Sequence, residues 1–293
     1  MPSRLGLIFV CVIASLRGQT PSADEIMQRV AANQDSAQEL RSAYVYHQKV
    51  LVRTLDSKGK VRYEETSEYT AAPSPNGTNK ELTSRRGRYL QKGKYITYQF
   101  RDSKCRENIF TCPPDKPEDG IDTALVRELG DELTNDSKGR DGLNPELFPL
   151  TTAEIKKYTF HLKGEETRQN MRAYRIAFEP IPTHDLNIDT SEGPWAGEAL
   201  ISAEEFQPIE VVTRIAHKVP TAVKILLGTD IHGLGFTVRY QKADGGAWFP
   251  VSYGTEFSVR AVFFFSRTIT MALDNSGFQK ADVSSTVRFA ELK

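Results

Sequence analysis

The feature that most constrains the fold is an alternation of apolar and polar residues with a period of two, which recurs along the chain after residue 43. Between residues 158 and 163, for example, Tyr158, Phe160 and Leu162 alternate with polar residues. Such alternation is typical of a strand with one buried face. Short polar turns separate successive segments and leave little room for crossover helices, so neighbouring strands should be antiparallel. The sequence therefore predicts a mainly β fold with roughly eleven to thirteen strands in meander order.

The expected strands follow one another with turn residues between them. They lie at residues 44–54, 61–70, 81–89, 95–101, 158–163, 174–178, 195–202, 208–215, 236–242, 248–255, 256–266, 267–273 and 283–292. Residues 73–77, with two prolines and a glycine, are typical of a turn. Residues 219–227 favour a short helix, and the glycine-rich residues 228–235 favour a helix stop followed by a turn.

Two longer helical segments also accompany the strands. Ser22 and Glu25 form a capping-box pattern, and apolar residues then recur at helical spacing, which predicts an amphipathic helix over residues 23–41. Residues 103–150 interrupt the strand pattern, and within them leucine and valine spacing predicts a helix over residues 121–133. Because both helices need an apolar surface to pack on, we expect them to cover the concave face of one strongly curved antiparallel sheet.

The first eighteen residues have the pattern of a secretory signal peptide. Arg4 precedes an apolar run over residues 5–16, which is too short to span a bilayer, since that takes ~20 residues. We therefore expect a signal peptide at 1–18 and a single exported, periplasmic domain at 19–293 with no transmembrane segment.

Removing residues 1–18 leaves 36 basic against 38 acidic residues, a net charge of −2. This balance, without a basic cluster, does not favour nucleic-acid binding.

Cys105 and Cys112 are the only cysteines outside the signal peptide. In an oxidising compartment, two cysteines separated by six residues in a polar segment most simply form a local disulfide. Two free thiols are the alternative. A metal pair would lack further ligands nearby, because no histidine or second cysteine pair lies close in the sequence.

One expected strand is apolar without alternation, at residues 261–265, so both of its faces should be covered. Either the strand lies in a filled core, or its aromatic side chains line an apolar cavity for an acyl chain. On the second interpretation the predicted ligand-binding residues are Phe236, Val238, Trp248, Phe257, Val259, Phe263 and Phe265, and Tyr240 could contribute to the same wall.

Catalytic signatures are missing from the sequence. It contains no nucleophile elbow, zinc-binding helix motif, phosphate-binding loop or dinucleotide fingerprint. The five histidines, His47, His161, His184, His217 and His232, are scattered singly. We therefore predict no catalytic residues, no metal site and no cofactor. An unrecognised hydrolase would need His184, His217 or His232 to meet a nucleophile in space.

Two stretches carry a resemblance to a known family. The capped segment Ala23-Asp-Glu-Ile-Met27 and the segment 196–211, a strand, an acidic turn and a strand that begins at Pro208, resemble bacterial outer-membrane lipoprotein-sorting proteins of the LolA-like superfamily and uncharacterised secreted relatives. The resemblance implies an open half-barrel with helices over a hydrophobic cavity that holds acyl chains of lipids or lipoproteins. A related branch of the superfamily senses envelope stress through protein contacts.

Two functional hypotheses follow. The first is a periplasmic, non-enzymatic carrier that takes up a lipid or acyl chain in the half-barrel. The second is a cell-envelope protein that binds another envelope protein, with the interior filled by its own side chains.

Overall fold

The amphipathic N-terminal segment forms α1 (Ala23–Arg41), as the sequence predicts. In this computed structural model the Ser22 hydroxyl accepts from the Glu25 backbone N–H at 3.2 Å, and the Glu25 carboxylate accepts from the Ser22 backbone N–H at 2.8 Å. This reciprocal capping box satisfies donors that a helix start otherwise leaves without partners. The structure describes residues 20–74, 77–101, 120–126, 142, 150–168, 170–181, 195–215, 229–232, 235–261 and 265–281.

The strands form one twelve-stranded sheet in which every recorded pairing is antiparallel. They are β1 (Tyr44–Leu55), β2 (Val61–Ser74), β3 (Gly77–Gln91), β4 (Lys94–Arg101), β5 (Tyr158–Arg168), β6 (Met171–Pro180), β7 (Trp195–Ser202), β8 (Pro208–Ile215), β9 (Thr229–His232), β10 (Thr237–Lys242), β11 (Trp248–Ala261) and β12 (Phe265–Lys280). A 3₁₀ turn, η3 (Ile155–Lys157), precedes β5.

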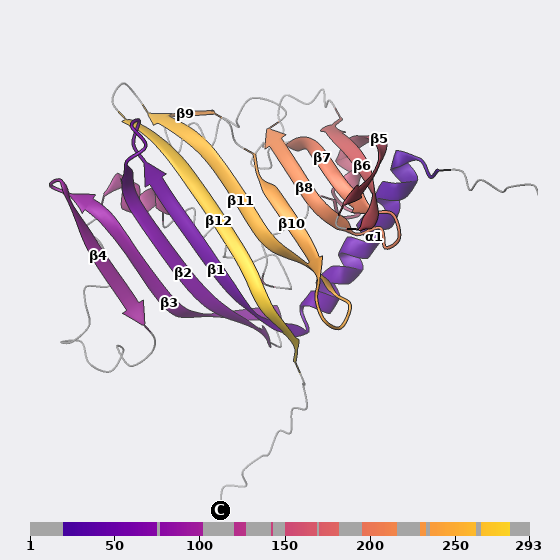
Figure 1. Ribbon diagram of the computed structural model, residues 1–293, viewed down its shortest axis with the longest axis horizontal. Helices are drawn as coiled ribbons and strands as arrows, with labels where there is room; N and C mark the ends of the chain where they lie inside the picture. Colours follow the sequence, from indigo (N-terminus) through magenta and orange to yellow (C-terminus); the bar gives the residue numbers. More distant parts are fainter. Residues whose placement is uncertain are drawn as a thin grey trace, which may run out of the picture.

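The strand order shows that the sheet is not a single meander (Figure 1). The order is β4-β3-β2-β1-β12-β11-β10-β8-β7-β6-β5, with β9 paired to β11. The first strand therefore pairs with the last, and this pairing joins two meanders that run away from it in opposite directions. The expected meander order is correct within each half and wrong at the join. Local turn signals cannot specify a pairing between residues more than 200 positions apart.

Two further details differ from the expected elements. Residues 248–261 form β11 and residues 265–273 belong to β12, where three strands were expected between 248 and 273. The alternation continues through Thr255 and Phe257, both buried, with no turn between them. Residues 229–232 form β9 along the edge of β11, where a turn was expected. The expected helix at 219–227 and strand at 283–292 lie outside the described residues.

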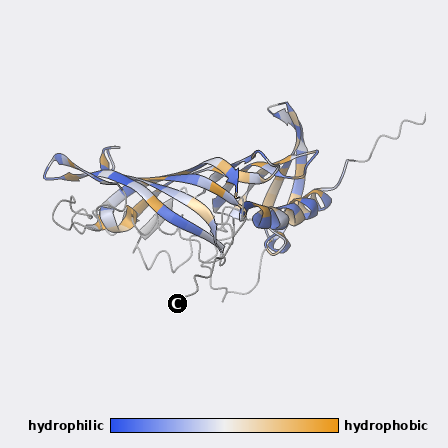
Figure 2. Cartoon of the chain, turned by 90° about the horizontal axis from the view of Figure 1, so that it is seen from below, coloured by the Kyte–Doolittle hydropathy of each residue, from blue (hydrophilic) through white to orange (hydrophobic). Residues whose placement is uncertain are grey.

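The sheet remains open, because β4 and β5 stand at opposite ends of the strand order (Figure 1). This agrees with the predicted mainly β open half-barrel. In the view of Figure 2, α1 lies beneath one end of the sheet. Residues 121–126 are also helical, at the start of the predicted 121–133 helix. Alternate β1 side chains pack with both segments, so α1 and residues 121–126 lie on one face, which we call the helix face.

Candidate functional site

The helix face carries two apolar clusters. The larger one lies beneath α1 and contains Ile26, Met27 and Val30 of the helix. Its other residues come mainly from β1, β2, β5, β6, β7, β8, β10 and β11 and from positions next to these strands. They include Tyr44, Tyr46, Tyr158, Ile176, Phe178, Ala199, Ile201, Val211, Phe236, Val238, Tyr240, Trp248 and Phe249. We call this set the first cluster.

The second cluster lies beyond the first on the same face and is covered by the helical residues 121–126. Leu125 and Val126 contribute to it, at 5% and 1% exposure. Its floor is formed by β1, β2, β11 and β12, with side chains that alternate along each strand. These are Val50, Val52, Tyr63, Phe257, Val259, Ile269, Met271 and Leu273.

The predicted ligand-binding residues divide between the two clusters. Phe236, Val238 and Trp248 lie in the first cluster, and Phe257 and Val259 in the second. All five side chains are buried, which agrees with an inward orientation. The sequence suggested one continuous wall. The structure shows two groups of residues, one packed beneath α1 and the other beneath residues 121–126.

Three other predicted positions complete this picture. Tyr240 lies in the first cluster. Phe265 begins β12, but its side chain and the whole of Phe263 lie outside what the structure describes. Whether the predicted residues contact a ligand stays a prediction. Tyr253 is the link between the clusters, because it packs against both and its ring lies 5.5 Å from that of Phe236.

Polar contacts attach α1 to the turn between β7 and β8. The Asn33 side chain donates to the carbonyl oxygens of Glu205 and Phe206 at 2.9 and 3.1 Å, and Gln34 donates to the Gln207 side chain at 2.8 Å. The Arg29 guanidinium lies 4.7 Å from the centre of the Phe206 ring. The cover of the first cluster is thus held by directional contacts as well as by apolar packing.

The same turn is also bound to the β10–β11 hairpin. The Glu205 carboxylate accepts from Lys242 Nζ at 2.8 Å and from Trp248 Nε1 at 3.0 Å. These two hydrogen bonds lower the pKa of Glu205 from its ordinary value. Trp248, predicted as a ligand contact, therefore also has a structural partner for its indole N–H.

One ion pair holds the cover of the second cluster. Arg267 of β12 donates to both Asp122 oxygens, from Nε at 2.6 Å and from a terminal nitrogen at 3.0 Å. Thr54 of β1 donates to the same carboxylate at 2.9 Å. Arg267 and Asp122 are only 13% and 18% exposed. Such a bidentate, largely buried pair fixes the orientation of its partners, so it anchors residues 121–126 over the apolar floor.

A polar cluster continues the helix face across β2, β3 and β4. The Tyr98 hydroxyl lies 2.5 Å from the Glu65 carboxylate and 2.7 Å from the Tyr63 hydroxyl. Ser67 donates to Glu65 at 3.3 Å, and Arg85 Nε lies 3.4 Å from the same carboxylate. Sequence reasoning missed this cluster. The alternation of Tyr63, Glu65 and Ser67 was available as a signal, but nothing in it located their partners on other strands.

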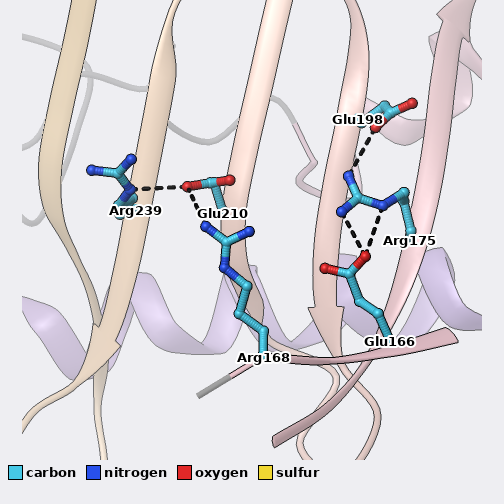
Figure 3. Close-up of polar contacts among 6 residues, drawn as sticks. All are labelled: Glu166, Arg168, Arg175, Glu198, Glu210 and Arg239. Atoms are coloured by element: carbon cyan, nitrogen blue, oxygen red, sulfur yellow. Dashed lines mark hydrogen bonds and ion pairs between the residues drawn. The ribbon is translucent and has the colours of Figure 1, made fainter.

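The outer face, opposite α1, carries ladders of paired charges (Figure 3). Arg175 binds Glu166 at 2.6 Å and Glu198 at 3.0 Å, while Glu210 accepts from Arg239 at 2.9 Å and lies 3.7 Å from Arg168. Figure 3 shows these side chains in front of the strands and α1 behind them. The two faces of the sheet thus differ in chemistry, with charge pairs outside and apolar clusters inside.

The other candidate residues are not gathered into a site in the described part of the chain. His47 and His161 lie exposed on β1 and β5, and His232 lies on β9. His184, His217, Cys105, Cys112 and the 1–18 segment lie outside the described residues. No group of three or more potential metal ligands occurs among the residues that the structure describes. None of the described helices has the length and apolar character needed to cross a membrane.

Comparison with known proteins identifies similar solved structures but no close relative. No protein-family model matches the chain, and no curated protein matches it. A DUF1329 family protein from Desulfovibrio piger is 10% identical, with 91% of this chain and 96% of that one covered and a TM-score of 0.38.

Two other similar structures belong to the family that the sequence resembles. A putative outer membrane lipoprotein-sorting protein domain from Vibrio parahaemolyticus is 9% identical, with coverage of 90% and 95% and a TM-score of 0.37. A LolA superfamily protein from Nitrosomonas europaea is 12% identical, with coverage of 90% and 96% and a TM-score of 0.33. At these identities and TM-scores the likeness says nothing of what this chain binds.

Proposed function

We propose that this protein is an exported, non-enzymatic carrier that binds the acyl chain of a lipid or lipoprotein on the helix face. The observation that carries the proposal is the second cluster, where an apolar floor on four strands packs against Leu125 and Val126 of a short helical segment. The exported location is supported by the signal-peptide pattern of residues 1–18.

Burial energies make an exchange between this cover and an acyl chain feasible. Fully burying a leucine or valine side chain stabilises by about 1.5–3 kcal/mol, and each buried methylene contributes about 0.8 kcal/mol. Roughly eight buried methylenes would therefore offset the loss of contacts made by Leu125 and Val126. An ordinary lipid acyl chain is long enough to supply them.

The first cluster is the less suitable place for such an exchange. Its cover, α1, contributes several fully buried apolar side chains, and the Asn33 and Gln34 contacts fix the helix to the β7–β8 turn. Displacing α1 would break these contacts and expose Ile26, Met27 and Val30 together. We therefore assign the acyl chain to the second cluster, with Phe257 and Val259 as predicted contacts.

The proposal is tested by the uptake of a fluorescent fatty acid by purified protein. Phe257→Asp, which places a charge in the second cluster, should abolish uptake, whereas Val212→Asp should leave it unchanged because Val212 is 44% exposed on β8. Circular dichroism establishes that both variants fold. Uptake by folded Phe257→Asp at the wild-type level would reject this site. Wild-type protein that takes up no lipid but retains an envelope partner would favour the protein-binding hypothesis instead.

A further inference from the structure

The helix face changes from apolar to polar along rows of paired residues that cross the strands. One row runs from Leu273 on β12 to Val50 on β1, then to Ser67 on β2 and Arg85 on β3. Residues paired across antiparallel strands share a face. Arg85 is therefore in line with the floor of the second cluster, two strands beyond its last apolar member in this row.

The neighbouring row repeats the change. It runs from Met271 to Val52, then to Glu65, Gly87 and Tyr98. A Cβ at Gly87 would overlap the Tyr98 phenol, so the glycine makes room for this ring to reach across β3 towards Glu65. Tyr98 and Glu65 therefore form a polar end to the apolar floor of the second cluster.

Within this polar end, Glu65 is saturated with donors. Its carboxylate meets Tyr98, Tyr63, Ser67 and Arg85, and it is only 13% exposed. A carboxylate has about four acceptor positions, so these contacts fill its capacity. The tyrosine and serine hydroxyls screen the Glu65 charge from a further molecule.

Arg85 makes a longer ion pair than Arg267, another arginine of this face. Its Nε lies 3.4 Å from both Glu65 and Ser67, at the long limit of a hydrogen bond, and its side chain is 31% exposed. Arg267, by contrast, makes a short bidentate pair with Asp122. Burial opposes the charge of Arg85, but the Glu65 charge and an interaction with Tyr69 that includes a side-chain hydrogen bond outweigh it and raise the pKa of Arg85, so the guanidinium stays charged.

We propose that Arg85 binds the anionic head group, carboxylate or phosphate, of an acyl ligand whose chain lies across β1, β12 and β11. This inference rests on the proposed carrier function and specifies its ligand class. Neighbouring strands lie ~4.8 Å apart, so Arg85 on β3 is roughly 10 Å from Val50 on β1. A head group at Arg85 therefore places the first methylenes of its chain over Ser67 and the remainder over the second cluster.

Calorimetric titration of the purified full-length protein with three oleoyl probes tests the proposal. Oleate carries a carboxylate, oleoyl lysophosphatidate carries a phosphate, and oleyl alcohol is neutral. Arg85→Gln should weaken binding of at least one anionic probe about 10-fold or more, the effect of losing a charged hydrogen bond. Its affinity for oleyl alcohol should stay at the wild-type value.

A second variant separates head-group recognition from a structural effect. Glu65→Gln keeps an oxygen that accepts from Tyr98 but removes a negative charge beside Arg85, so it should raise the affinity for the anionic probes. Arg88→Gln is the matched control, because Arg88 lies on the same strand but points to the outer face, where it pairs with Glu64. It should change none of the three affinities.

The outcomes distinguish this inference from the function on which it rests. If Arg85→Gln binds all three probes as tightly as wild type, the head-group site is wrong and the acyl carrier stands. A loss of anionic affinity in Glu65→Gln, equal to that in Arg85→Gln, would also overturn the site. If wild-type protein binds none of the probes, the carrier function itself fails. If Arg85→Gln loses affinity for only one of the two anionic probes, oleate or oleoyl lysophosphatidate, that probe carries the anion that the site prefers.

Discussion

Single residues determine how neighbouring strands and turns of the sheet contact one another. Gly87 is one, because the Tyr98 ring occupies the place that a β-carbon would take. Glu205 is another, because its carboxylate joins the β7–β8 turn to Lys242 and Trp248. Neither role can be derived from the sequence, since each depends on a contact between strands that only the folded sheet brings together.

At Gly87 we expect substitution by alanine to destabilise the protein by about 1–3 kcal/mol, the usual cost of forcing an extra carbon into a packed site. Gly254→Ala is the matched control, because no atom lies within 4 Å of a Cβ at that position on β11. Urea denaturation measures both. Equal stability of Gly87→Ala and Gly254→Ala would contradict the close approach of Tyr98.

For Glu205 we expect an acid transition in tryptophan fluorescence. The pKa of this carboxyl is lowered by its hydrogen bonds with Lys242 and Trp248, so their stabilisation is present at neutral pH and is lost as the pH falls through the lowered pKa. Fluorescence of the Trp195→Phe variant, which retains Trp248, should change at a pH below the ordinary glutamate range. Adding Glu205→Gln should remove that change, and a persisting transition would point to another group.

Among the elements, α1 and residues 121–126 cover neighbouring parts of one face by different means. α1 uses a broad apolar stripe and several polar contacts, whereas residues 121–126 use two apolar side chains and the Asp122–Arg267 pair. The capping box and the helical spacing made α1 predictable to its ends. The role of Asp122 was not predictable, because its partner Arg267 is 145 residues away.

We expect Asp122→Asn to loosen the cover of the second cluster. The substitution leaves Arg267 largely buried without its anion, which costs more than losing an exposed pair. Amide hydrogen exchange of residues 121–126 should accelerate by about 10-fold or more, and uptake of the fluorescent fatty acid should increase. Glu154→Gln, which removes a more exposed pair with Lys157, should change neither. Unchanged exchange in Asp122→Asn would show that the ion pair does not hold this segment.

At the scale of the whole molecule, the open antiparallel sheet could be predicted from the sequence. The pairing of β1 with β12, which joins the two meanders, could not. Alternation and turn residues located most strands within a few residues, because each signal is local. The pairing of β1 with β12 depends on complementary rows such as Val50 with Leu273, which no local pattern specifies. For the same reason the sequence could not show that Phe236, Val238 and Trp248 belong to one buried cluster and Phe257 and Val259 to another.

The most direct test of acyl binding on the helix face is photochemical cross-linking of wild-type protein with a diazirine-bearing fatty acid, followed by peptide mapping. We predict labels on residues of the second cluster, Phe257, Met271 or Leu273, and competition by unlabelled oleate. Labels confined to the outer face, around Val212 and the charge ladders of Figure 3, would contradict the account.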